Sequence, residues 1–106
     1  MIENRICVFY TTFSSEEEAS QLSEKVVKVG FAACSNIQSI KSCYFWEGRF
    51  NKDDEVSCIL KTTKELAPAL KEQIERHHPY DLPCILHWEV NVNQAYKEWV
   101  ESNTKS

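Results

Sequence analysis

The sequence predicts an α+β domain in which strands and helices follow one another in the order β-α-β-β-α-β, with an extra helix at the C-terminus. Three observations lead to this prediction. Short β-rich apolar runs alternate with segments whose apolar residues repeat at helical spacing. Serine and glycine residues suited to helix caps bound the first helical segment. One β-like stretch is much longer than a usual strand.

The first strand is predicted over Ile6 to Tyr10, a run with apolar residues on both parities, as expected of a strand covered on both faces. The polar stretch 11–15 breaks this run. Ser14 and Ser15 can each cap a helix, because Glu17 and Glu18 follow them at the three-residue spacing of a capping box. The helix that begins there is expected to end at Gly30, because glycine readily adopts the left-handed conformation of a C-terminal cap.

Residues 31–50 are β-like again, and the stretch from about Ala33 to Arg49 is roughly three times as long as a usual strand. Gly48 to Asp54 carries turn residues, so the chain is expected to return antiparallel along Glu55 to Thr62. Such a hairpin projects beyond a small sheet and exposes edges that proteins normally cover. A partner subunit is the simplest cover. The alternative is two shorter strands separated by a bulge or bend near Gln38 to Lys41.

The second helix is expected to begin with Thr62 and Glu65 as a capping box. It must stop before Pro79, because the residue before a proline disfavours helical geometry. Alternating apolar residues then predict a last strand over Cys84 to Val92. Asn93 can cap a short final helix.

This order is the split βαβ arrangement called ferredoxin-like, in which helices cover one face of an antiparallel sheet. We expect a long projecting β-hairpin and an extra C-terminal helix as additions to it. The chain has 106 residues, close to the commonest size of one domain, and shows no linker or repeat. Residues 1–106 are therefore interpreted as a single domain.

The composition is globular and mildly acidic, with 16 acidic residues against 12 basic ones. No basic run or stripe appears, so we expect no nucleic-acid partner. No apolar run approaches the roughly 18 residues of a membrane span, so we expect no membrane partner. The five cysteines have no CxxC spacing and an odd count, which favours free thiols in a reducing compartment. A cytoplasmic location is therefore predicted.

Five motifs carry a resemblance to a known family. They are Thr11-Thr12, Ala32-Ala33-Cys34-Ser35-Asn36-Ile37, Ser42-x-Tyr44-x-Trp46-Glu47-Gly48, Lys61-Thr62-Thr63 and His78-Pro79-Tyr80-Asp81-Leu82-Pro83. In this order and spacing they resemble the CutA divalent-cation tolerance family across nearly the whole chain. The resemblance implies a ferredoxin-like subunit, a homotrimer whose long hairpins pair between subunits, and a link to tolerance of divalent metals, copper especially.

The resemblance also implies metal-ligand positions, which hold Tyr10, His78 and Cys84 here. Only the histidine matches the family's residue type, and a cysteine in place of an acid favours softer ions such as Cu(I) or Zn(II). Each candidate also has a structural interpretation. His78 can serve the helix dipole, and Cys84 can be a packed thiol. We predict His78 and Cys84 as metal ligands, for copper or another divalent ion, with no obligatory cofactor.

Tyr44, Trp46, Lys61 and Tyr80 are the predicted ligand-binding residues, because they belong to the motifs of the resemblance. Tyrosine and tryptophan pair an apolar body with a polar handle, which suits a ligand cleft, and Lys61 can hold an anion. The alternative is trimer packing with a solvated lysine. No nucleophile with an oriented base and no glycine-rich phosphate loop is present, so an enzyme is not expected.

The leading interpretation is therefore a trimeric CutA-like protein that binds copper or other divalent ions and takes part in metal-ion response or homeostasis. The main alternative is a trimeric structural or signalling scaffold without a specific metal site, binding a small molecule or protein in an inter-subunit cleft. RNA binding through sheet aromatics is a third interpretation, which the acidic charge opposes. An unidentified enzyme is a fourth.

Overall fold

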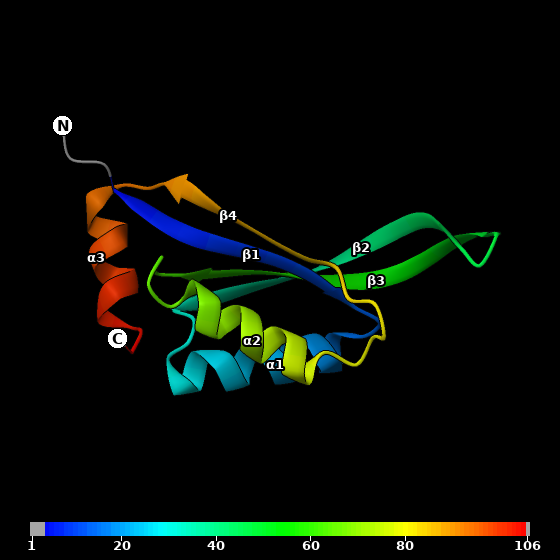
Figure 1. The fold of residues 1–106 in the computed structure, drawn as a ribbon, viewed down its shortest axis with the longest axis horizontal. Coiled ribbons are helices and arrows are strands. Elements are labelled where there is room, and N and C mark those ends of the chain that lie inside the picture. The colour runs from blue at the N-terminus through cyan, green and yellow to red at the C-terminus, as the bar shows by residue number, and fades with distance from the viewer. Residues whose placement is uncertain (1–3, 106) are drawn as a thin grey trace.

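The computed structural model describes residues 4–105, which form a four-stranded antiparallel sheet and three helices (Figure 1). The strands lie in the spatial order β2-β3-β1-β4. The elements are β1 (Arg5–Phe13), α1 (Glu16–Val29), β2 (Cys34–Trp46), β3 (Arg49–Thr62), α2 (Ala67–His77), β4 (Ile85–Asn91) and α3 (Gln94–Ser102). This is the predicted ferredoxin-like order with the extra C-terminal helix.

Both faces of the central strand β1 are covered, as its sequence predicted. Cys7 and Phe9 lie in the main buried cluster, beneath α1 and α2. Ile6 and Val8 point to the other face and pack with Val100 of α3. Figure 1 shows that α3 lies at the end of the sheet remote from the projecting hairpin. The face opposite α1 and α2 is therefore covered by α3 at one end only.

The limits of α1 confirm Ser15, one of the two predicted N-terminal caps, and Gly30 as the C-terminal cap. The Ser15 hydroxyl accepts a hydrogen bond from the backbone N–H of Glu18 at 3.2 Å. The Glu18 carboxylate in turn accepts one from the Ser14 hydroxyl at 2.6 Å. At the other end, Gly30 has a φ of 97° and its N–H bonds to the carbonyl of Val26. The helix thus begins and ends where local hydrogen bonds satisfy its free backbone groups.

The turn of the hairpin is shorter than predicted. β3 begins at Arg49 rather than at Glu55, so the polar run after Gly48 is a strand and not a loop. Only Glu47 and Gly48 form the turn, with φ values of 51° and 76°. Two successive positive φ angles are typical of the type I′ turn, whose twist matches that of the paired strands.

Pairing between β2 and β3 continues without a bulge over the whole of β2, so the alternative of a bend near Gln38 to Lys41 is wrong. Along β3, side chains up to Asp54 are mostly exposed, and those from Val56 onward are mostly buried. We call residues 40–55 the hairpin arm. The arm gives the molecule its elongated shape of 49 × 29 × 21 Å (Figure 1).

Two strand limits differ from the prediction. β1 continues to Phe13 instead of ending at Tyr10, because Thr11 still pairs with both β3 and β4. β4 occupies Ile85–Asn91, slightly less than the predicted Cys84 to Val92. None of the helices within residues 4–105 has the length and apolar character that crossing a membrane would require.

The start of α2 also differs from the prediction. Thr62 does not cap it, because the Thr62 hydroxyl donates to the carbonyl of Phe31 at 2.7 Å. The Thr63 hydroxyl oxygen instead accepts the backbone N–H of Leu66 at 3.1 Å, in the turn that precedes the helix. α2 ends at His77, before the proline that was expected to stop it.

Candidate functional site

A cleft of about 450 Å³ opens where the hairpin arm meets the loop between α2 and β4. Four of the six predicted site residues line it, namely Tyr44, Trp46, Tyr80 and Cys84. Its other lining residues are Thr12, Glu55, Asp81 and Leu82. Residues from three distant parts of the chain therefore converge on one surface hollow.

The strand residues of the cleft share one face of the sheet. Side chains alternate between faces along a strand, and the register of the paired strands fixes which residues go together. Thr12, Tyr44 and Glu55 fall on the face opposite α1 and α2. The cleft is therefore an extension of the open sheet face and is separate from the main core.

Tyr80 is held in the cleft from both of its ends. Its hydroxyl donates to a carboxylate oxygen of Glu55 at 2.7 Å, and its backbone N–H donates to Nδ1 of His78 at 3.1 Å. Partial burial, together with the bond to Glu55, raises the pKa of Tyr80 far above its ordinary value. The phenol therefore stays neutral and fixes the position of the Glu55 carboxylate.

Tyr44 and Trp46 form the arm side of the cleft. The Tyr44 hydroxyl donates to the carboxylate of Asp53 on the paired strand, and this bond raises the pKa of Tyr44. The two side chains are 40% and 50% exposed. Their ring surfaces are thus accessible to a ligand.

His78 lies behind the cleft. It is only 9% exposed, and its ring stacks on that of Phe13 with a centroid distance of 4.4 Å. Nε2 lies 2.8 Å from the carbonyl oxygen of Thr12, to which it donates, while Nδ1 accepts from Tyr80. Burial lowers the pKa of His78, so the ring is neutral. Both ring nitrogens are engaged, and His78 joins the end of β1 to the Tyr80 loop.

The remaining predicted residues divide between the cleft and elsewhere. Cys84 is exposed at the cleft. Lys61 lies apart from the cleft, with Nζ 5.5 Å from the ring centroid of Tyr96. Tyr10 pairs with β3 and β4 on β1 and does not line the cleft. Within residues 4–105, no three His, Cys, Asp or Glu side chains are grouped so that they could hold one metal ion.

Sequence reasoning missed the two carboxylates of the cleft, Glu55 and Asp81. Asp81 directly follows Tyr80 in a motif that had been recognised, so its position was available. Glu55 could be placed at the cleft only once the hairpin turn was known to lie at Glu47 and Gly48. A turn at 47–48 pairs Glu55 with Ile40 and puts it on the same face as Tyr44.

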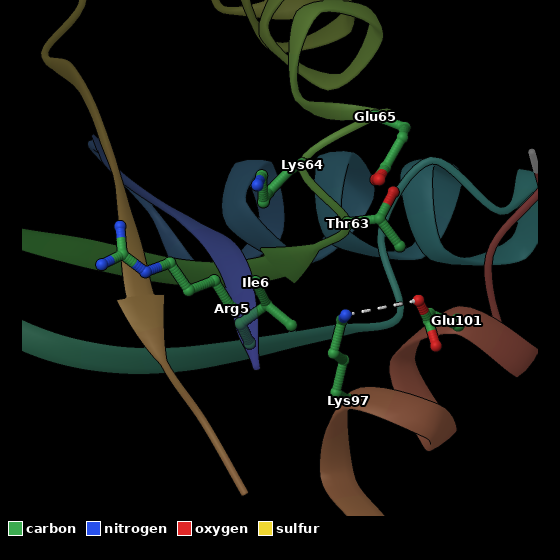
Figure 2. A pocket seen from close by; sticks show the side chains of 7 residues that line it. All are labelled: Arg5, Ile6, Thr63, Lys64, Glu65, Lys97 and Glu101. Carbon is green, nitrogen blue, oxygen red and sulfur yellow. Dashed lines mark ion pairs between the residues drawn. The ribbon is translucent and has the colours of Figure 1, made fainter. Parts of the chain in front are cut away.

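A second, smaller pocket of about 120 Å³ lies between the start of β1, the turn before α2, and α3 (Figure 2). Lys97 pairs there with Glu101 at 3.9 Å. Arg5 and Lys64 each lie within ion-pair distance of Glu89, at 3.8 and 3.9 Å. Basic groups at this pocket are thus balanced by carboxylates of the same chain.

The fold and the cleft define a small ferredoxin-like α+β protein with a projecting hairpin and a surface cleft at the base of that hairpin. The model of the CutA1 divalent ion tolerance protein family matches residues 7–103. The chain therefore belongs to the CutA1 divalent ion tolerance family, as its motifs predicted.

Similar proteins support this assignment at the level of sequence and of structure. The divalent-cation tolerance protein CutA of Pyrococcus horikoshii is 39% identical over 99 residues, which are 92% of this chain and 97% of the relative. The crystal structure of CutA1 from Ehrlichia chaffeensis matches with a TM-score of 0.92 at 34% identity, over 100% of both chains. A CutA from Archaeoglobus fulgidus, described as periplasmic, matches with a TM-score of 0.87 at 27% identity, over 95% of this chain and 99% of its own.

Proposed function

We propose that this chain is a homotrimeric divalent-cation tolerance protein that binds copper or another divalent metal ion and takes part in the response to metal ions. Family membership supports the tolerance role. The observation that favours cation binding is the cleft itself. Glu55, Asp81 and Cys84 line it together, and none of the described residues lining it is basic.

The donors of the cleft suit a metal bound by few protein ligands. The exposed Cys84 thiol, once deprotonated, prefers soft ions such as Cu(I), while the carboxylates also accept harder divalent ions. Because no three-ligand group occurs within residues 4–105, one subunit would supply at most two such donors. Water or a neighbouring subunit would complete the coordination. His78 is a weaker candidate than its motif implied, because a metal would have to displace one of its two hydrogen bonds.

Calorimetric titration with copper under reducing conditions tests this proposal. The native protein is compared with a Cys84→Ser, Asp81→Asn double variant, and with a Cys43→Ser, Asp54→Asn double variant as the matched control. Cys43 and Asp54 are exposed residues of the hairpin arm that do not line the cleft. We expect saturable binding that weakens about tenfold or more only in the cleft variant. Equal binding by all three proteins, or none, would contradict a metal site at the cleft.

The trimer is proposed on separate grounds. On the face opposite α1 and α2, the β4 residues Leu86 and Trp88 are 52% and 46% exposed. β2 and β4 are also the edge strands of the sheet, and exposed edges are normally covered. The number three comes from the family resemblance. Light scattering at micromolar concentration should give three times the 12.3 kDa mass of one chain, and a monomer mass would overturn the proposal.

A second candidate function is a non-catalytic scaffold that binds a small molecule or protein in the cleft, without a specific metal site. Two observations favour it: three aromatic side chains line the cleft, and both nitrogens of His78 are already engaged. In either case we propose a cytoplasmic location, since the five cysteines are free thiols, which suits a reducing compartment. Recovery of the protein with the cytoplasmic fraction of its cell would test this.

A further inference from the structure

The charged groups of the cleft have a single sign. Glu55 and Asp81 line it, and Asp53 lies next to it, bonded to Tyr44. No described residue that lines the cleft is a lysine or arginine. The pocket of Figure 2 differs, because basic and acidic side chains line it together and Lys97 pairs with Glu101 inside it. Of these two hollows, the cleft is therefore the one whose acidic groups meet no basic side chain among the described residues of its own wall.

Three aromatic rings enclose the same space from two directions. Tyr44 and Trp46 come from the hairpin arm, and Tyr80 comes from the loop before β4. Both tyrosine hydroxyls are occupied as donors to carboxylates, so the rings are held while their surfaces stay available. The face of an aromatic ring carries partial negative charge and attracts cations.

The size and the apolar wall of the cleft indicate what kind of cation fits. A volume of about 450 Å³ lies in the range of small-molecule sites and far exceeds that of one bare ion. Leu82, which is 71% exposed, adds an aliphatic surface to the rings. A hydrated metal ion would leave these apolar walls unused, whereas a cation with attached carbon groups would contact both the rings and the acids.

We propose that the Tyr44–Trp46–Tyr80 cleft binds an organic cation, with an ammonium or methylated ammonium group against the rings and close to Glu55 and Asp81. This inference rests on the proposed function only in taking the cleft to be a ligand site. The ligand class is different, since a metal needs the donor atoms of the cleft and an alkylammonium group needs its ring faces and charge.

Choline and its uncharged isostere 3,3-dimethylbutan-1-ol are the probes that test charge recognition, because they have nearly the same shape. Saturation-transfer NMR and calorimetry on the native protein would measure the binding of each. We expect saturable binding of choline and at least about tenfold weaker binding of the alcohol, since only the charged probe is attracted by the ring faces. Equal binding of the two probes, or no saturable binding of choline, would overturn the inference.

Two variants locate the site. Trp46→Leu removes a ring and is matched by Trp99→Leu, which removes a similarly exposed tryptophan from α3. Asp81→Asn removes one charge from an exposed loop and is matched by Asp54→Asn on the arm. We expect Trp46→Leu to weaken choline binding about tenfold, Asp81→Asn about threefold, and both controls less than twofold. Because Asp81 is exposed, its variant keeps the test decisive if Trp46→Leu fails to fold. Controls that weaken binding as much as the cleft variants would overturn the assignment.

Copper titration of Trp46→Leu and of one further single variant, Cys84→Ser, separates this inference from the proposed metal function. If both are correct, Trp46→Leu weakens choline binding about tenfold and keeps copper binding, whereas Cys84→Ser weakens copper binding and keeps choline binding. If copper binding depends on Cys84 and the protein does not bind choline, the organic-cation site alone is overturned. If choline binding depends on Trp46 and the protein does not bind copper, the metal proposal alone is overturned.

Discussion

Phe9 in the covered part of the sheet and Phe45 in the hairpin arm have opposite surroundings. Phe9 is fully buried between the sheet and its two helices, whereas Phe45 is 73% exposed and meets Phe50 edge-on at 5.7 Å. The β2–β3 pairing nevertheless continues unchanged from one region to the other. Backbone pairing therefore suffices to shape the arm, while side-chain packing stabilises the covered part. The arm leaves its aromatic residues available for a ligand or another subunit.

Truncation of Phe9 and of Phe45 to alanine should give the largest difference in stability between the covered sheet and the arm. Phe9→Ala should lower the free energy of unfolding by about 3–5 kcal/mol, because it leaves a cavity in the core. Phe45→Ala should cost about 0.5 kcal/mol or less within one subunit, and any further loss should shrink on dilution because it comes from association. Urea unfolding at two protein concentrations measures both effects. If Phe45→Ala lowered the free energy of unfolding as much as Phe9→Ala at both concentrations, the arm would pack like the core.

The two glycines give a smaller and equally local contrast. A Cβ at Gly30 would stand 2.9 Å from Cγ of Lys105 at a φ of 97°, whereas a Cβ at Gly48 would meet no atom within 4 Å at a φ of 76°. We expect Gly30→Ala to lower the free energy of unfolding by about 2 kcal/mol and Gly48→Ala by about 1 kcal/mol. Thermal unfolding of both variants measures which is less stable. A lower stability of Gly48→Ala than of Gly30→Ala would refute this prediction.

Acid should weaken the link that His78 makes between the end of β1 and the Tyr80 loop. Burial lowers the pKa of His78 below its unfolded value of about 6.5, so at low pH the unfolded chain binds the extra proton. Its contribution is fully present above about pH 6.5 and is lost as pH falls through the folded pKa, with a slope of up to about 1.4 kcal/mol per pH unit.

Urea unfolding between pH 7.5 and 4.5 measures this contribution as the difference between the native protein and His78→Gln. His77→Gln, at the exposed neighbouring histidine, is the control and should keep the native pH profile. A native protein and a His78→Gln variant with the same pH slope would show that His78 does not couple folding to protonation.

The smallest expected effect concerns the bond between the loop and the arm. Tyr80→Phe removes the donor to Glu55 and should lower the free energy of unfolding by about 1 kcal/mol. Tyr44→Phe, whose bond to Asp53 lies within the exposed arm, should lower it less. Denaturant midpoints compare the two, and a larger loss for Tyr44→Phe would indicate that the arm contributes more than the loop contact.

The fold was predictable at the two ends of α1, where bonds between neighbouring residues decide the structure. Ser15 and Gly30 each specify a helix end through bonds to neighbouring residues, and both were confirmed. The polar run after Gly48 was mistaken for a loop because its composition is typical of one. In the arm, strand residues need not be apolar, since no core covers them and pairing with β2 satisfies their backbone.

The site was predictable only in part, because its residues converge through the tertiary structure. Tyr44, Trp46, Tyr80 and Cys84 were found from motifs, and the structure brings them to one cleft. Lys61 belongs to the same set of motifs, yet it lies beside Tyr96. No sequence pattern distinguishes these cases, since the distinction depends on the register of β3 and on the path of the loop after α2. The engagement of both His78 nitrogens likewise involves Thr12, which is remote in sequence.

The unbroken ladder of the arm limits how its length can change. Residues added or removed at the Glu47–Gly48 tip leave every pair below it in place, so arms of different reach are compatible with the same cleft. A single residue inserted in β2 below Tyr44 has another consequence. Because side chains alternate between faces, that insertion turns Tyr44 and Trp46 to the opposite side of the sheet. Length variation in this protein is therefore tolerated at the tip of the arm and excluded at its base.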